Sequence, residues 1–309
     1  MNSQKIALAP LAYYWSREDT LSFYLDAASW PVDIVYLGEV VCSRRRELKP
    51  DDWLSLAAEL RAAGKEVVMS TQTLIDSESD RRSMHRLIER AVENQLQIEA
   101  NDLSAVRTLH ALQQPFVAGT HLNIYHGGTL DWFAGLGATR FLPPLELSGA
   151  DLAALQQVRP ANMQTEVQVW GRMALAFSAR CFTARHYRLK KDNCEFRCEA
   201  HPDGLLLCSR DGSQFLNLNG IQTQSAGCAD LSAQLPELFA MQVDVLRIQP
   251  QSRRMGEVVA AFAQARDAQQ ATTLPAAVFP ALSTPCNGYW FGQAGMLDRQ
   301  DTVAVTGAM

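Results

Sequence analysis

The sequence predicts an α/β fold, namely a (β/α)8 barrel of the TIM type with an inserted cysteine-rich loop and a small β-meander. Short apolar segments rich in β-branched residues alternate with amphipathic segments at intervals of about 25–35 residues. The strand-like segments are mostly apolar, as in parallel strands that helices cover on both sides. The chain has 309 residues, of which 47% are hydrophobic, and this suits one barrel domain over residues 1–309.

The first four strand and helix units follow from local signals. Pro10 ends the first strand, and Ser16 opens a Ser-x-x-Asp pattern that resembles a capping box. Gly64 suits the end of the second helix, and Asn101 with Asp102 suits the start of the fourth. We therefore predict strands at 5–10, 33–38, 66–71 and 97–100, with helices at 16–30, 50–63, 80–94 and 103–113.

The remaining four units are less regular. Pro143 and Pro144 interrupt the sixth strand, where they cannot donate backbone hydrogen bonds. A doubly wound open sheet is the main alternative fold, but no G-x-G-x-x-G follows the first strand, which counts against a dinucleotide-binding version. We predict strands at 116–124, 139–147, 165–169 and 244–249, with helices at 129–135, 148–158 and 253–270.

Residues 171–228 break the alternation of strands and helices. They carry a cysteine-rich stretch, followed by Asp203-Gly204 and Asp211-Gly212, which are strong turn signals between apolar runs. We interpret 171–228 as an insert between the seventh and eighth barrel units. Residues 275–309 show no clear period, and we expect this irregular tail to cover one end of the barrel or to join an interface.

Composition and charge narrow the function classes. The net charge of −5 argues weakly against a nucleic-acid partner, although the basic run at 180–191 keeps that alternative open. The N-terminus lacks the basic and apolar regions of a signal peptide, and no run of 18 apolar residues predicts a membrane span. We therefore expect a cytoplasmic protein, in which cysteines stay reduced.

Three cysteines of the insert predict a metal centre. Cys194 and Cys198 form C-x-x-x-C, and twelve residues separate Cys181 from Cys194. Three thiolates do not complete a four-thiolate site, and Cys42, just after the second strand, is the best candidate for the fourth. Because neighbouring positive charge lowers the pKa of a thiol, we expect the nearby cations to favour thiolates. These cations are Arg180, Arg185, His186, Arg188, Lys190, Lys191 and Arg197.

The four thiols leave three interpretations open: a zinc ion, an iron–sulfur cluster, or buried apolar side chains. Zinc sites usually show two cysteine pairs, whereas this chain has one pair and two distant single cysteines. A cluster with four thiolates carries a net charge of about −2, which the surrounding cations would offset. We expect Cys208, Cys228 and Cys286 to be structural thiols.

Polar residues near strand ends are candidates for a substrate pocket, because substrates bind at the C-terminal mouth of such barrels. Asn101 could instead be a helix cap, and Glu166 could instead form a structural ion pair, since a buried carboxylate needs a partner. The sequence shows no H-E-x-x-H and no G-x-S-x-G motif, so no catalytic residue is assigned. The pocket candidates are Asn101, Asn123, Glu146, Glu166 and Trp170.

The segment 166–198 resembles the signature of the collagenase-like peptidase family. That pattern runs Glu, Gly, Ser and then cysteines, here Glu166, Gly171, Ser178, Cys181, Cys194 and Cys198. Upstream, a further series of the family is matched by Asn123, Phe133, Gly137, Arg140 and Glu146-Leu147-Ser148. Leu145 stands where longer members carry Arg, and their C-terminal extension is missing. Both differences speak against peptidase or RNA-modifying activity.

The resemblance is strongest to short members of the family, and it implies a function. It implies a [4Fe-4S] cluster on Cys42, Cys181, Cys194 and Cys198, and a heterodimer with a paralogous partner. The pair would hydroxylate the ring of a ubiquinone precursor without O2, with a lipid-binding accessory protein presenting the prenylated precursor. The alternatives are a family member of the tRNA-hydroxylation type and a collagenase-like peptidase.

Overall fold

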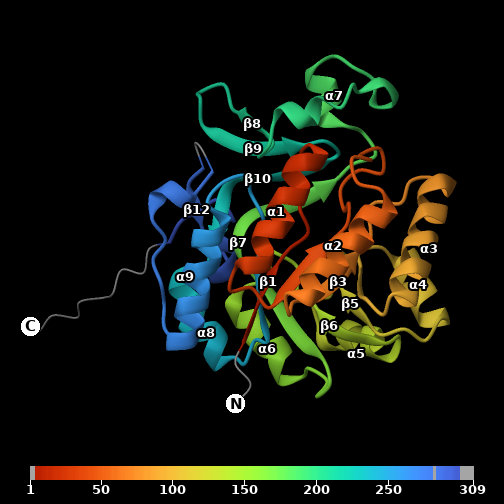
Figure 1. Ribbon diagram of the computed structural model, residues 1–309. Helices are drawn as coiled ribbons and strands as arrows, with labels where there is room; N and C mark the ends of the chain where they lie inside the picture. The colour runs from red at the N-terminus through yellow and green to blue at the C-terminus, as the bar shows by residue number, and fades with distance from the viewer. Residues whose placement is uncertain (1–3, 281–282, 300–309) are drawn as a thin grey trace, which may run out of the picture.

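Eight parallel strands close into a barrel in the computed structural model, which describes residues 4–280 and 283–299 (Figure 1). Each strand pairs with the next, and β11 pairs with both β1 and β7, which closes the ring. The predicted fold class is therefore confirmed. The barrel strands are β1 (Lys5–Leu8), β2 (Ile34–Leu37), β3 (Glu66–Ser70), β4 (Gln97–Ala100), β5 (Phe116–Ala118), β6 (Ala138–Phe141), β7 (Gln164–Phe177) and β11 (Val245–Ile248).

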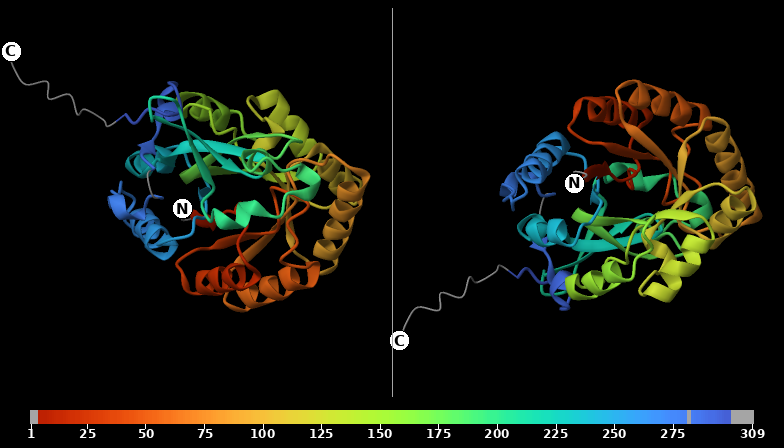
Figure 2. Two further views of the ribbon diagram at one scale, coloured as in Figure 1. Left: turned by 90° about the horizontal axis from the view of Figure 1, so that it is seen from above. Right: turned by 90° about the horizontal axis from the view of Figure 1, so that it is seen from below.

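Helices surround the barrel on its outside, as the views along its axis show (Figure 2). Ser16, Ser77, Asp102 and Ser148 each cap a helix by accepting a hydrogen bond from a backbone N–H of its first turn. A short helix before β11 was not predicted from the sequence. The helices are α1 (Arg17–Ser29), α2 (Pro50–Ala62), α3 (Glu78–Glu93), α4 (Leu103–Ala111), α5 (Gly127–Gly135), α6 (Gly149–Gln157), α8 (Leu235–Ala240) and α9 (Met255–Ala268).

Two apolar layers hold the barrel together. One cluster of fully or nearly buried side chains includes Ile34, Val68, Val117 and Val245, each from a different barrel strand. A much larger cluster packs the alternate strand residues against the surrounding helices. Strands that are covered on both faces must be apolar on both, which is why β2 (IVYL) is buried throughout. None of the described helices is long and apolar enough to cross a bilayer.

Three strands end furthest from the predicted positions, and the other strand ends lie within two residues of them. β5 ends at Ala118 because the chain turns through a 3-10 helix, η1 (Thr120–Leu122), and then through Asn123 at φ 58°. β6 ends at Phe141, before the two prolines. β7 continues to Phe177, past the expected end at 169, because β10 (Gln222–Asp230) pairs antiparallel with its outer half. Gly171, at φ +112°, lies where β7 passes against Gln249, and a Cβ there would come within 2.4 Å of the Gln249 side chain.

The insert lies over the C-terminal end of the barrel, at the top of Figure 1. It contains α7 (Phe182–His186) and two 3-10 turns, η2 (Lys191–Asn193) and η3 (Arg197–Ala200). β8 (Leu205–Cys208), β9 (Gln214–Asn219) and β10 then form the expected antiparallel meander. The part of the insert that carries the cysteines is thus placed above the strand ends.

The described part of the tail returns to the barrel. β12 (Pro285–Cys286) pairs in parallel with β10, and η6 (Gly288–Phe291) contacts α6, where the Trp290 ring packs against Gly149. A further 3-10 turn, η5 (Ala276–Val278), lies beside α9. The predicted tail at 275–309 also includes 281–282 and 300–309, which lie outside the described residues.

Candidate functional site

The four cysteines predicted as ligands come from two distant parts of the chain. Cys42 lies on the loop after β2, and Cys181 is the N-cap residue of α7. Cys194 directly follows η2, and Cys198 lies within η3. The thiol of Cys42 is close enough to Cys198 for the charge of Cys198 to raise its pKa. The thiol of Cys181 is close enough to Cys42 and Cys194 for the same effect. The fold therefore brings all four thiols, each partly buried, into one region.

Three of these sulfur atoms have N–H groups nearby. The backbone N–H of Ala184 donates to the Cys181 sulfur at 3.4 Å. The backbone N–H of Arg44 lies within hydrogen-bonding reach of Cys42, and the Arg45 guanidinium within reach of Cys198. Hydrogen bonds of this kind surround the sulfurs of iron–sulfur clusters and tune them. Each of these N–H groups lowers the pKa of the thiol that it faces and so opposes the effect of burial.

Burial raises the pKa of Cys42, Cys181 and Cys198, and the guanidinium of Arg45 opposes this shift in all three. The expectation that nearby cations give a lowered thiol pKa is therefore wrong for these residues. Most of the predicted cations, such as Arg185, are exposed to solvent, which weakens their effect on a partly buried thiol. A metal ion would have to displace the thiol protons on binding.

Arg45 is the cation that lowers the pKa of three of the cysteines, and the sequence analysis did not single it out. Its side chain is only 2% exposed. It donates to the carbonyl oxygen of Ala12 at 2.7 Å and to Oδ1 of Asn219 at 2.6 Å, and it lies 3.8 Å from Glu39. Three arginines, Arg44 to Arg46, follow each other here. The only sequence signal that could have pointed to Arg45 is its place three residues after Cys42.

Two ion pairs join the cysteine-rich segment to the barrel. The Arg44 guanidinium donates to the backbone carbonyl of Asp192 at 2.7 Å and lies 3.3 Å from its carboxylate. The Lys191 ammonium lies 2.7 Å from the carboxylate of Asp76, on the segment before α3. Both contacts are made by adjacent residues shortly before Cys194, so the chain is held against the barrel just ahead of this cysteine.

The thiols share a region without converging on one point. The described residues contain no group of three or more histidine, cysteine, aspartate or glutamate side chains that could hold a single metal ion. A zinc ion would need its thiolates at about 2.3 Å from one centre. A four-iron cluster is larger and binds each thiolate through a different iron. The described residues therefore show no preformed mononuclear metal site.

A small cavity with several polar lining residues opens at the C-terminal mouth of the barrel. Glu99, Asn101, His121, Arg247 and Gln249 are among its lining residues, and most of the others also follow barrel strands. This mouth is where ligands bind in barrels of this type.

The cavity and the cysteines are neighbours. Ala12, Val40 and Phe177 line the cavity, and the same three side chains belong to an apolar cluster against which Cys42 and Cys181 pack. Apolar side chains that line the cavity therefore also lie near two of the thiols.

The predicted pocket residues fall into different environments. Asn101 lines the mouth cavity, and its side-chain nitrogen donates to the carbonyl oxygen of Thr71 at 2.9 Å. Asn123 and Glu146 are exposed, and Glu146 accepts a hydrogen bond from the Tyr125 hydroxyl. Glu166 and Trp170 are fully buried and lie outside the lining of this cavity.

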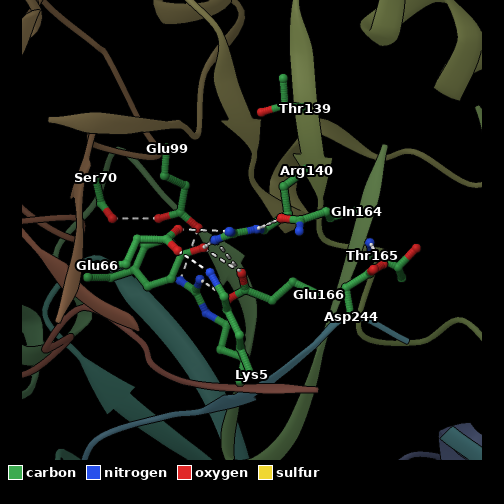
Figure 3. Close-up of polar contacts among 12 residues, drawn as sticks. Lys5, Glu66, Ser70, Glu99, Thr139, Arg140, Gln164, Thr165, Glu166 and Asp244 are labelled. Atoms are coloured by element: carbon green, nitrogen blue, oxygen red, sulfur yellow. Dashed lines mark hydrogen bonds and ion pairs between the residues drawn. The ribbon is translucent and has the colours of Figure 1, made fainter. Parts of the chain in front are cut away.

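Glu166 belongs to an ionic network inside the barrel (Figure 3). Arg247 lies 2.9 Å from its carboxylate and Arg140 3.5 Å from it. Arg140 also lies 2.8 Å from Glu66, and Arg247 lies 3.0 Å from Glu99. The structural ion pair, which the sequence left open as an alternative for Glu166, is the arrangement present. Arg247 extends from this network to the lining of the mouth cavity.

The network is electrically balanced. The cations Arg140, Arg247 and Lys5 face the carboxylates of Glu66, Glu99 and Glu166. Burial raises the pKa of Glu66, but the Arg140 guanidinium and Lys5 outweigh it, so the net pKa lies below its usual range. A buried charge is tolerated where it is paired in this way. The network therefore supports the floor of the cavity.

Comparison with known proteins gives one family match and several distant structural likenesses. The family model described as Peptidase family U32 matches residues 22–282. The structure titled as the U32 peptidase Mk0906 aligns with a TM-score of 0.43 at 11% identity, covering 81% of this chain and 94% of that one. The spore cortex-lytic enzyme SleL of Bacillus megaterium QM B1551 aligns with a TM-score of 0.44 at 9% identity, covering 88% of this chain and 76% of that one.

Proposed function

We propose that this chain, which belongs to peptidase family U32, is the iron–sulfur subunit of an O2-independent hydroxylase that acts on the ring of a ubiquinone precursor. The observation that carries the proposal is the gathering of Cys42 with Cys181, Cys194 and Cys198 beside the mouth of the barrel. Among short members of the family, the sequence most resembles UbiV. The proposed partner is a UbiU-like paralogue, and a lipid-binding accessory protein would present the prenylated precursor in the cytoplasm.

The four cysteines are the proposed ligands of a [4Fe-4S] cluster. Such a cluster supplies one-electron transfer when it is bound. The backbone N–H of Ala184 and the guanidinium of Arg45 would hold negative charge at Cys181 and Cys198. Because the side chain of Arg45 is buried, it acts in a low-dielectric environment, where its charge is less screened than that of the exposed cations.

The barrel would keep the cluster and a ligand near each other without direct contact. Ala12, Val40 and Phe177, which line the cavity, would lie between the two. The ion pairs of Arg44 and Lys191 would fix the cysteine loop over these side chains.

A second function, modification of RNA, is favoured by one observation. Arg185, Arg188 and Lys190 of the insert are exposed or half-buried, and the rings of Tyr187 and Phe196 are exposed beside them. Exposed cations interleaved with aromatic side chains suit single-stranded nucleic acid. This alternative predicts RNA binding that weakens steeply with salt. An absence of RNA binding at low salt would remove it.

The proposal is tested with cysteine variants in cells and in purified protein. A strain that lacks this chain should lose ubiquinone under anaerobic growth and retain it under aerobic growth. Cys181→Ser and Cys198→Ser should fail to restore it, whereas Cys208→Ser, on exposed β8, should restore it fully. Purified without oxygen, the wild-type chain should be brown and bleach with dithionite. Restoration by the ligand variants would overturn the proposal.

A further inference from the structure

A cavity of about 610 Å³ opens between α2 and α3 (Figure 1). Among the described residues, none lines both this cavity and the mouth cavity. The helices on either side pack directly, α1 on α2 and α4 on α3, whereas the loop before α2 takes part in the cavity. We propose that the cavity is a docking groove for an acidic segment of another protein, which binds there in an extended conformation.

The groove is elongated, because one wall follows a single face of α3. Ser79, Ser83, Arg86 and Arg90 line it, and their spacing of three or four residues places them on the same side of the helix. From the first of these residues to the last, the helix rises by about 16 Å. The opposite wall comes from residues 46–53. An extended chain of about five residues spans this length.

Three cations of the groove, Arg46, Lys49 and Arg86, have no carboxylate within ion-pair distance among the described residues, and all three are exposed. Arg46 donates to the backbone carbonyl oxygen of Ser43 at 3.3 Å, and Arg86 donates to the hydroxyl of Ser83 at 3.2 Å. Most of the donors of these two guanidinium groups therefore remain for a ligand. Guanidinium groups bind carboxylates through paired hydrogen bonds.

The other charges that line the groove are largely matched within the protein. Glu39 lies 3.8 Å from Arg45, and Arg90 forms an ion pair with Asp51 of α2. The other carboxylate of the lining belongs to Asp80, which is buried in the first turn of α3. An excess of positive charge therefore faces the groove, although the chain as a whole has a net charge of −5. This charge is complementary to an acidic partner.

Apolar side chains also line the groove. Leu48, Trp53 and Leu87 are half-buried, and Met84 is buried. The Trp53 ring packs edge-on against Tyr24, with ring centroids 6.0 Å apart, which fixes its position. Trp and Arg often carry most of the binding energy of protein interfaces. A half-buried ring is a poor platform for stacked bases, so the groove favours an acidic peptide with apolar side chains over RNA.

The groove reaches the loop that carries Cys42. Ser43 and Arg45 of this loop line it, and the Arg45 guanidinium also lies within hydrogen-bonding reach of Cys198. A docked segment would therefore contact the Cys42 loop directly. The inference goes beyond the proposed function, because the segment would bind whether or not the chain holds iron.

The test measures binding of three probes to the full chain, purified without oxygen, by isothermal titration calorimetry at low salt. The first probe is a capped peptide of about six residues in which Glu and Leu alternate. The second is the same peptide with Gln in place of Glu, and the third is an oligouridine of equal charge. We expect the Glu peptide to bind at least about tenfold more tightly than the Gln peptide, because three exposed ion pairs of ordinary strength give about this factor. High salt should remove most of the difference.

Three outcomes of this comparison would overturn the proposal. Equal affinity for the two peptides would show that the cations do not select the ligand. No measurable binding of the Glu peptide would exclude an acidic segment in the groove. Tighter binding of the oligouridine than of the Glu peptide would assign the groove to nucleic acid instead.

Charge reversal on α3 locates the binding. Arg86→Glu should weaken binding of the Glu peptide by at least about fivefold, whereas Arg86→Lys should keep most of the affinity. Lys49→Glu tests the opposite wall in the same way. Arg82→Glu is the matched control, because this exposed residue of α3 does not line the groove. An equal loss in Arg86→Glu and Arg82→Glu would overturn the groove in favour of general electrostatic attraction.

A second measurement tests the contact with the Cys42 loop, and this part rests on the proposed function. In a wild-type chain that holds iron, saturation with the Glu peptide should slow the loss of iron to a chelator. The Gln peptide at the same concentration is the control. Peptide binding with an unchanged rate of iron loss would overturn the link to the Cys42 loop, while a chain without iron that binds the Glu peptide would overturn the proposed function and support the groove.

Discussion

The guanidinium of Arg44 donates a hydrogen bond to the backbone carbonyl of Asp192 at 2.7 Å. This contact joins the loop of Cys42 to the segment of Cys194, although 148 residues separate the two partners in sequence. It directly links the two parts of the chain that supply the candidate ligands. The arrangement of the four thiols therefore depends on contacts that have little to do with the barrel core.

Arg44→Ala should loosen the cysteine loop without unfolding the protein. The side chain of Asp192 is 94% exposed, so the pair should contribute less than about 1 kcal/mol to the free energy of unfolding. Iron should nevertheless be lost faster to a chelator, because Cys194 is less firmly held. Arg46→Ala, which removes an exposed neighbour, is the control and should release iron at the wild-type rate. Equal release rates in both variants would contradict this role.

Arg45→Met should be far more damaging than Arg46→Met. It removes a buried cation and leaves Glu39 without its partner, and breaking such a pair costs about 3–5 kcal/mol. The oxygen atoms of Ala12 and Asn219 also lose their donor. Urea denaturation and iron content should show lower stability and lower occupancy together. A stable Arg45→Met variant with full iron would show that this cation is not needed.

Glu166→Gln should destabilise the fold but leave the metal site of the folded fraction intact. Arg247 and Arg140 would each lose a charged partner inside the barrel, at a cost of about 3 kcal/mol or more. The exposed Glu146→Gln should change stability by less than about 0.5 kcal/mol. Urea denaturation measures both. A neutral effect of Glu166→Gln on unfolding would contradict the structural role of this carboxylate.

The ion pairs of Glu66 predict a defined loss of stability in acid. Since Arg140 and Lys5 hold the pKa of Glu66 below its unfolded value of about 4.3, the folded state binds this proton less readily than the unfolded state. The contribution is complete above the unfolded pKa and is lost as the pH falls through the folded pKa. Between about pH 5 and pH 3, the unfolding free energy should therefore fall more steeply in the wild type than in Glu66→Gln. Parallel curves would contradict this prediction.

His121 should titrate far below an ordinary histidine. Burial, with help from Arg247, brings its pKa to about 4, whereas the unfolded chain in urea should show about 6.5. Folding stability that depends on the neutral imidazole should accordingly decline as the pH falls from about 6.5 towards 4. NMR of histidine ring protons, with His121→Gln for assignment, measures this. A midpoint near 6.5 in the folded chain would contradict the burial of this imidazole.

The barrel was predictable because each strand carries its own local signal. Segments such as β2 are apolar on both faces and end near turn residues, so neighbouring strands need not be known to find them. β7 is the counterexample, since its length depends on pairing with β10, more than 40 residues away. Glu166 is similar, because its charged partners Arg140 and Arg247 lie on other strands.

The sequence singles out the thiols of the candidate site but not the residues that surround them. The spacing of the cysteines is enough to single out Cys181, Cys194 and Cys198. Arg45 could not be told from its two arginine neighbours, because only the meander that covers it makes it buried. The cavity at the mouth was also hidden, since its lining comes from many separate loops.

The proposed function depends most on Cys42, which is remote in sequence and would complete a cluster with the three cysteines of the insert. The most direct test is the iron and acid-labile sulfide content of the wild-type and Cys42→Ser chains, both purified without oxygen. We predict about four of each per wild-type chain and a loss of most of both in Cys42→Ser. A Cys42→Ser chain with the full wild-type content, or a wild-type chain with zinc and no sulfide, would contradict this assignment.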